Sequence, residues 1–167
     1  MKKNYSELFE KMHIAGKLAA KTLDELTPFV KPGVTTNFLD RICYEYIKDH
    51  GGNSAPLYYR GFPKSCCTST NHTVCHGIPS EKILEDGDIM NVDVTAFIDE
   101  HHGDTGRMFC IGDVSVKSKN LISATYESMM KAISIIKPGI KLGDIGAAIQ
   151  DYVESKGLSV VKDFCGH

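Results

Sequence analysis

The 167-residue sequence lacks any apolar run approaching the roughly 18 residues that a membrane-spanning helix needs. It also lacks a basic cluster, because 19 Lys and Arg residues stand against 21 Asp and Glu residues. Nucleic acid is therefore not expected as a direct partner. No apolar stretch follows the lysines of MKKNYSELFEKMH, which argues against a signal peptide. We therefore expect a cytoplasmic protein that does not bind membranes.

Cysteine is too sparse for a disulfide scaffold, and no pair has CxxC spacing. The six cysteines are expected to be reduced, as in a cytosolic protein, and occupy positions 43, 66, 67, 75, 110 and 165. An apolar share of 42% and a charged share of 24% are typical of a globular protein. A chain of this length predicts one domain that buries roughly 70% of its unfolded surface.

Hydrophobic periodicity predicts an α+β fold. Residues 4–27 read as a helix whose buried stripe comprises Leu8, Met12, Ala15, Ala19, Leu23 and Leu26. A second helix follows Thr36 or Asn37 and ends at Gly51-Gly52. Residues 53–79 are rich in Gly and Pro and are expected to be irregular with short strands. The remaining expected elements are strands at 88–98 and 104–112, helices at 118–136 and 143–156, and a short strand from 158.

A repeat with an offset of 106 residues links the two ends of the chain. Lys31-Pro32-Gly33 corresponds to Lys137-Pro138-Gly139, and the same offset aligns Leu39 with Ile145 and Gly51 with Gly157. This period is too long for a solenoid and indicates a duplicated half-domain. The first half-repeat covers about 4–112, and the second starts at about 113 and is cut at 167. We therefore expect one domain, 1–167, that is a fragment of a longer fold.

Two aspartates are the first candidates for chemistry. Asp93 lies on the polar face of the strand at 88–98, beside Asn91 and Thr95, where a buried carboxylate needs a cation. A turn centred at Ile98-Asp99 would place Asp104 directly opposite, about 5 Å away. That register needs a bulge, for example at Gly103. The alternative is that Asp104 is a solvated turn residue.

Histidines beside glycine add to this pair. His76 and His167 each neighbour a Gly that lets the backbone approach closely, although a lone histidine is more often structural. One of His101 and His102 could also approach the site, with solvent exposure as the default. An Asp, Asp, His set suits Mn, Fe, Co or Zn. Two such ions would activate a bridging water as a hydroxide that attacks an amide or ester carbonyl.

A cysteine hydrolase is the weaker chemical alternative. Cys75 and His76 are adjacent, and adjacent residues of an extended strand point to opposite faces. We therefore do not expect them to act together as nucleophile and base.

Four long strings closely resemble type I methionine aminopeptidases: YRGFPKSCCTSTNHTVCHGIP, DGDIMNVDVT, HGDTGRMF and KPGIKLGDIGAAIQDYVESKGLSVVKDFCGH. The resemblance implies the α+β pita-bread fold, with two pseudo-symmetric halves of which the second is incomplete here. It also implies removal of the initiator methionine from nascent proteins by hydrolysis of the first peptide bond. The nucleophile would be a metal-bound hydroxide at two divalent ions (Mn, Fe, Co or Zn).

The resemblance also implies residue roles. Asp93 would bind one metal, Asp104 would bridge both, and His167 would be the histidine ligand. His76 would be catalytic and hydrogen-bond the substrate near the scissile amide, and Thr95 would lie close to the metal-bound solvent. The pocket for the methionine side chain would be lined by Tyr59, Phe62 and Cys67.

The sequence departs from the family pattern in two respects. His72 replaces a usual glutamate, with little expected effect. Two glutamate ligands that the family carries beyond His167 have no counterpart here, so the chain alone is expected to hold metal poorly. A non-catalytic truncated relative or binding module of the same fold is therefore an alternative.

Within the fold, the strings CHGIP and GFPKS favour a methionine enzyme over a proline-specific aminopeptidase or prolidase. The implied partners are the nascent polypeptide and the ribosome, with a monomer at full length.

Overall fold

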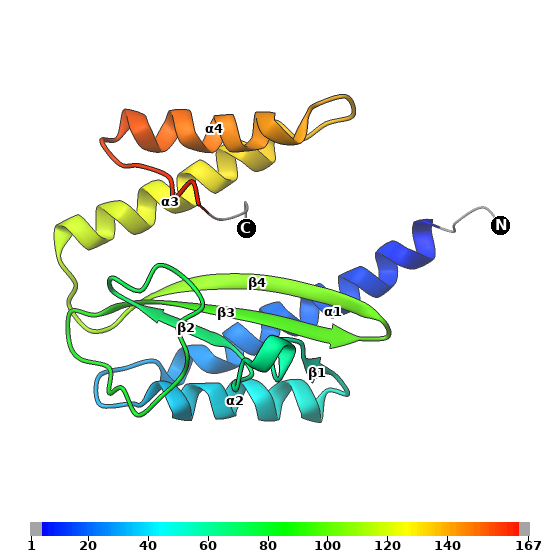
Figure 1. Ribbon diagram of the computed structural model, residues 1–167, viewed down its shortest axis with the longest axis vertical. Helices are drawn as coiled ribbons and strands as arrows, with labels where there is room; N and C mark the ends of the chain where they lie inside the picture. The colour runs from blue at the N-terminus through cyan, green and yellow to red at the C-terminus, as the bar shows by residue number, and fades with distance from the viewer. Residues whose placement is uncertain (1–4, 164–167) are drawn as a thin grey trace. The chain divides into compact units, whose positions relative to one another are not determined.

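Four antiparallel strands form the sheet of the computed structural model, which describes residues 5–163 (Figure 1). The hairpin strands β3 (Ile89–Ile98) and β4 (His101–Cys110) pair along their whole lengths. The short strands β1 (Asn53–Ser54) and β2 (Cys67–Thr70) share the other edge of β3. The chain divides into two compact units at Val114, and this sheet belongs to the first unit.

Two helices cover one face of the sheet. Helix α1 (Tyr5–Leu26) packs against β3 and β4 and is followed by the short helix η1 (Thr27–Phe29). Helix α2 (Thr36–Asp49) packs against α1 and β1, and its N-cap Thr35 accepts a hydrogen bond from the Phe38 amide at 3.2 Å. Alternate residues of β3 meet the helices: Met90, Val92, Val94 and Ala96 are fully buried. The predicted split of this strand into an apolar and a polar face is confirmed.

The second unit is a pair of helices. Helix α3 (Val116–Ser134) begins after the N-cap Ser115, and α4 (Leu142–Ser155) follows the second Lys-Pro-Gly turn. These bounds agree with the predicted helices to within two residues. The predicted strand from 158 is wrong over the described residues 158–163, which form no ladder with another segment. No helix of the described part is long and apolar enough to cross a membrane.

The predicted buried stripe of α1 is correct only in its second half. Ala15, Ala19, Leu23 and Leu26 are buried, whereas Met12 is 52% exposed and Leu8 is half-buried. The sheet explains the change, because Gly103 of β4 meets α1 at Ala15. The first turns of α1 therefore extend past the surface that buries the rest of the helix.

Gly103 fixes the closest approach between α1 and the sheet. A Cβ at this position would lie 2.2 Å from the backbone carbonyl of Ala15 and 2.3 Å from the amide nitrogen of Gly16. Glycine is needed here because helix backbone occupies the side-chain space. The predicted bulge at Gly103 is wrong, since the β3–β4 ladder continues through it, opposite Ala96.

We expect Gly103→Ala to lower the free energy of unfolding by about 1–3 kcal/mol, because helix backbone cannot move away as a flexible side chain would. Gly106 lies on the opposite face of β4, where an added Cβ would lie 3.4 Å from the Asn91 side chain and 3.6 Å from the Val92 carbonyl oxygen, close to ordinary van der Waals contact. Gly106→Ala is therefore the matched control, with an expected change within about 0.5 kcal/mol. Urea unfolding followed by circular dichroism measures both. Equal losses in the two variants would contradict the close-contact interpretation.

Candidate active site

The polar face of the β3–β4 hairpin carries both predicted aspartates. A two-residue turn, Asp99-Glu100, joins the strands, with φ values of 49° and 65°. Such a turn, with positive φ at both residues, matches the twist of a hairpin. It pairs Thr95 with Asp104 and Asp93 with Gly106. Asp93 and Asp104 are thus diagonal neighbours on one face, with Cα atoms about 7–8 Å apart.

Two predictions about this hairpin are wrong as a result. The second strand, expected at 104–112, starts three residues earlier, at His101. The expected direct opposition of Asp93 and Asp104 is replaced by the diagonal arrangement, without a bulge. The physical reason is that Asp99 and Glu100 adopt left-handed backbone conformations, which lets the turn close in two residues. The shared face of the two carboxylates is nevertheless retained.

Strand β2 brings Cys67 to the same face, directly opposite Asp93. Burial, followed by the electrostatic effects of Asp93, Cys75 and Asp104, raises the pKa of the Cys67 thiol to about 12. Cys67 is therefore a neutral thiol at physiological pH. The same effects show that Cys67, Asp93, Cys75 and Asp104 share one electrostatic environment.

The loop between β1 and β2 starts and ends beside these residues. The Ala55 amide donates a hydrogen bond to the Thr95 carbonyl at 2.9 Å, and Cys67 pairs with Asp93. Asp40 of α2 fixes the returning end, because its carboxylate accepts hydrogen bonds from the amides of Ser65 at 2.8 Å and Cys66 at 3.1 Å. The two ends of the loop thus straddle the segment of β3 that carries Asp93 and Thr95.

The predicted pocket residues Tyr59 and Phe62 lie on this loop, at the short helix η2 (Tyr59–Gly61). Tyr59 is 63% exposed and Phe62 is half-buried. Two residues of the loop that carry side chains, Tyr58 and Arg60, have φ values of 68° and 49°. Left-handed conformations of this kind are unfavourable for such residues and concentrate at functional sites.

His76 lies at the outer edge of β2. The Thr68 amide donates to the Gly77 carbonyl at 2.8 Å, and the Gly77 amide donates to Ser69 Oγ at 3.1 Å. A Cβ on Gly77 would come within 2.2 Å of the Thr68 carbonyl oxygen, so only glycine fits there. This contact holds the exposed His76 next to the strand that carries Cys67.

Cys75 and His76 are not in an extended strand, contrary to the expectation from sequence. Cys75 forms a bend and His76 has a φ of 52°. The argument that they point to opposite faces therefore does not apply. Both are exposed, and no hydrogen bond joins them among the described residues.

Sequence reasoning left open which of two adjacent histidines faces the site. Counting by two from Asp104 places His102 on the polar face, with its ring centroid 4.7 Å from that of Phe97. His101 lies on the other face, with Nδ1 2.6 Å from the Asp99 carbonyl oxygen. The strand period could have identified His102, but only once the turn position was known.

The donor set of the polar face fits one part of a divalent-metal site. Asp93 and Asp104 offer carboxylate oxygens, which suit ions such as Mn and Zn. Within residues 5–163, no group of three or more His, Cys, Asp or Glu side chains is arranged to hold a metal. The third predicted ligand, His167, lies outside the described residues. The described residues thus provide two of the predicted donors.

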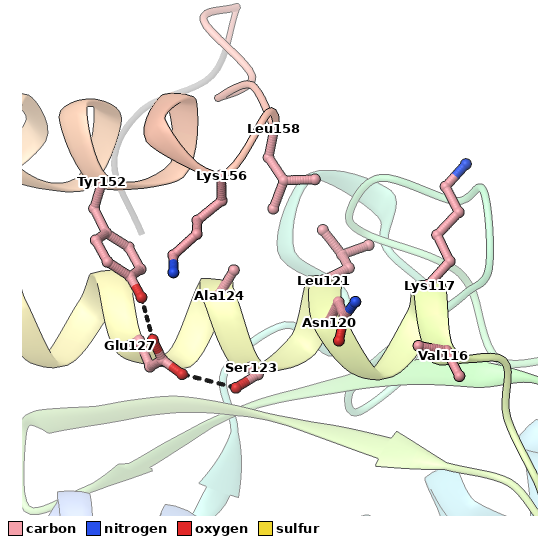
Figure 2. A pocket seen from close by; sticks show the side chains of 10 residues that line it. All are labelled: Val116, Lys117, Asn120, Leu121, Ser123, Ala124, Glu127, Tyr152, Lys156 and Leu158. Atoms are coloured by element: carbon pink, nitrogen blue, oxygen red, sulfur yellow. Dashed lines mark hydrogen bonds between the residues drawn. The ribbon is translucent and has the colours of Figure 1, made fainter.

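A groove of the second unit carries none of the predicted residues (Figure 2). It has a volume of about 670 Å³ and lies along α3 and α4. Tyr152 and Ser123 donate hydrogen bonds to the Glu127 carboxylate, which lowers the pKa of Glu127 and raises that of Tyr152. Lys131 and Lys156 lie over the Tyr152 ring, at 4.8 and 5.3 Å. The groove carries one carboxylate, that of Glu127, together with several cationic groups. It differs in this from the hairpin face, which carries two carboxylates.

Comparison with known proteins gives consistent results. Residues 10–167 match the model of metallopeptidase family M24. A methionine aminopeptidase of Rickettsia prowazekii is 57% identical over 159 residues, which are 95% of this chain and 61% of that protein. The crystal structure of methionine aminopeptidase from Rickettsia prowazekii superimposes with a TM-score of 0.95 at 56% identity, covering 97% of this chain and 65% of that one. The Thermotoga maritima enzyme gives a TM-score of 0.92 at 38% identity, covering 95% and 64%.

The cysteine environments predict a pattern of alkylation. Iodoacetamide at pH 8 should label the exposed Cys75 and Cys110. Cys67, with a pKa of about 12, should stay unlabelled because only about one molecule in ten thousand is a thiolate at that pH. The buried thiols of Cys43 and Cys66 should be equally protected. Peptide mass spectrometry measures each site, and rapid labelling of Cys67 in the folded chain would contradict the environment described for it.

Proposed function

Because the chain belongs to metallopeptidase family M24, we propose that it is part of a methionine aminopeptidase that removes the initiator methionine from nascent proteins. The chain spans 61–62% of the length of the methionine aminopeptidases of Rickettsia prowazekii and Salmonella typhimurium, so the activity is proposed for a protein of their full length. The chain has the α+β pita-bread fold over the part it covers. The observation that carries the proposal is the polar hairpin face that holds Asp93, Thr95 and Asp104 together.

Asp93 would hold one metal ion and Asp104 would bridge two, with His167 as a further ligand. Two carboxylates on one face of the hairpin suit this role, because diagonal neighbours on adjacent strands can turn their oxygens toward a common point. The ions would be divalent Mn, Fe, Co or Zn. When bound, such ions supply Lewis acidity that lowers the pKa of water and polarises a carbonyl.

The other residues would bind and orient the peptide. His76, at the edge of β2, would hydrogen-bond the substrate near the scissile amide. Thr95 pairs directly with Asp104 and lies two residues after Asp93 on the same face. Tyr59, Phe62 and Cys67 would form the slot for the methionine side chain. A neutral thiol and aromatic rings suit a flexible thioether, and the raised pKa of Cys67 keeps that thiol uncharged.

The substrate would be the N-terminus of a nascent polypeptide, met in the cytoplasm and at the ribosome. The full-length protein would be a monomer with one catalytic domain, in which residues 4–112 and those from about 113 form two related halves. These assignments follow from the proposed activity and from the 106-residue offset of the two Lys-Pro-Gly turns.

Release of methionine from a Met-Ala peptide tests the proposal. The chain is assayed alone and as a chimera whose remaining length comes from the Rickettsia prowazekii relative, each with Mn or Co. We expect the chimera to release methionine and to lose this activity on chelation by EDTA. Failure of a folded, metal-loaded chimera on every Met-initiated peptide would overturn the proposal and favour a non-catalytic module of the same fold.

Metal binding gives a separate test of the two aspartates. Asp104→Asn in the chimera should weaken Mn binding at least about tenfold, which corresponds to a loss of about 1.4 kcal/mol. Asp99→Asn is the matched control, because Asn tolerates the left-handed conformation of this turn residue. Isothermal titration calorimetry measures both. Equal Mn affinity in the Asp104 variant and the unsubstituted chimera would remove Asp104 from the proposed site.

A further inference from the structure

Cys67, a residue of the proposed methionine slot, occupies an end position of its strand. It is the first residue of β2, so its pair with Asp93 is the terminal pair of the β2–β3 ladder. Terminal pairs open more readily than interior pairs, because regular structure supports them on one side only. The position of the Cys67 thiol therefore depends on what holds the two residues before it, Ser65 and Cys66.

The carboxylate of Asp40 holds both of those residues. Its Oδ1 atom accepts hydrogen bonds from the Ser65 amide at 2.8 Å, the Ser65 hydroxyl at 2.6 Å and the Cys66 amide at 3.1 Å. Hydrogen bonds to an ionised acceptor are roughly twice as strong as those between neutral groups. One atom of α2 thus fixes the segment that leads into Cys67.

The core in turn fixes Asp40. Leu39 and Cys43, on the same helix, are fully buried in the hydrophobic cluster beneath the sheet. Asp40 itself is 9% exposed, and its Oδ2 atom lies 4.0 Å from the Lys64 ammonium group. A buried carboxylate with both hydrogen-bond donors and a nearby cation is costly to displace. Asp40 is therefore a rigid point from which the loop is held.

A second buried carboxylate of this unit, Asp88, has similar surroundings. It is 7% exposed and lies 3.6 Å from the Lys82 ammonium group. It accepts hydrogen bonds from the Asn71 side chain at 2.8 Å and the Glu85 amide at 3.1 Å. Asn71 follows the last residue of β2, whereas Asp40 holds the residues before the first. The two carboxylates thus hold opposite ends of the same strand.

We propose that Asp40 is a positioning residue that sets where Cys67 lies in the methionine slot. This inference rests on the proposed function, since it takes Cys67 to line that slot. Asp40 acts through Ser65 and Cys66 and leaves the bond-breaking step to the groups on the hairpin face. Its effect therefore belongs in KM, because loss of a fixed wall weakens substrate binding without altering the reacting groups.

Hydrolysis of a Met-Ala peptide by the metal-loaded chimera tests the inference. Asp40→Ala should raise KM about tenfold and leave kcat within about twofold of the unsubstituted value. Asp40→Asn keeps an oxygen that can accept the same hydrogen bonds, so its KM should stay within about threefold. A purely structural role would instead reduce the folded fraction, which lowers the apparent kcat and leaves KM unchanged.

Asp88→Ala is the matched control. It removes a carboxylate of similar burial and bonding, and should lower the thermal stability of the chimera much as Asp40→Ala does. Its KM should nevertheless match that of the unsubstituted protein. An unchanged KM in Asp40→Ala, or an equal rise in KM in Asp40→Ala and Asp88→Ala, would overturn the inference.

Alkylation of Cys67 by iodoacetamide separates this inference from the proposed function. At pH 8, Cys67 should react at least about fivefold faster in Asp40→Ala than in the unsubstituted chimera, with each site resolved by peptide mass spectrometry. Cys43 should stay protected in the core, and Cys67 should stay protected in Asp40→Asn and Asp88→Ala. This pattern without methionine release would count against the proposed activity alone. Equal rates at Cys67 in Asp40→Ala and the unsubstituted protein would overturn the role of Asp40.

Ser65→Ala decides the matter if Asp40→Ala does not fold. It removes one of the three donors to Asp40 and leaves the two backbone amides in place. We expect the same changes on a smaller scale, about threefold in KM and about twofold in the alkylation rate of Cys67. A folded Ser65→Ala chimera with neither change would overturn the inference.

Discussion

The pairing register of β3 and β4 is the constraint on which the rest of the structure depends. Because side chains alternate along a strand, a slip of one residue would move Asp93 into the core and Val92 into solvent. The two-residue turn Asp99-Glu100 sets the register, and the backbone of α1 packed on Gly103 leaves no room for another side chain at that point. One face of the hairpin therefore carries the core, and the other is left free to carry polar groups.

Segments distant in sequence gather at that polar face because they share the edge of β3. The loop from Ala55 to Cys66 begins beside Thr95 and ends beside Asp93, and Gly77 packs against β2 one strand further out. Left-handed residues occur in both segments, at Arg60 and His76. The regular sheet thus supports irregular loops, an arrangement in which rigid elements position residues that bind or react.

Period-two alternation was sufficient to predict the two faces of β3, and period 3.6 was sufficient to locate the helices. The turn could not be predicted, because Asp99 and Glu100 adopt positive φ without the glycine that usually marks such a turn. The diagonal position of Asp104 and the orientation of His102 depend on that turn. The exposure of Met12 could not be predicted from the sequence either, because it depends on where the sheet meets α1. The roles of single residues were inferred from the resemblance to type I methionine aminopeptidases and not from hydrophobic periodicity.

A crystal structure of the full-length chimera soaked with Mn²⁺, with the ion located by anomalous diffraction, tests the central claim most directly. The account predicts an Mn²⁺ ion on the polar face of the hairpin, bound by carboxylate oxygens of both Asp93 and Asp104. An ion bound elsewhere, or a structure in which the two carboxylates face opposite sides of the sheet, would contradict it.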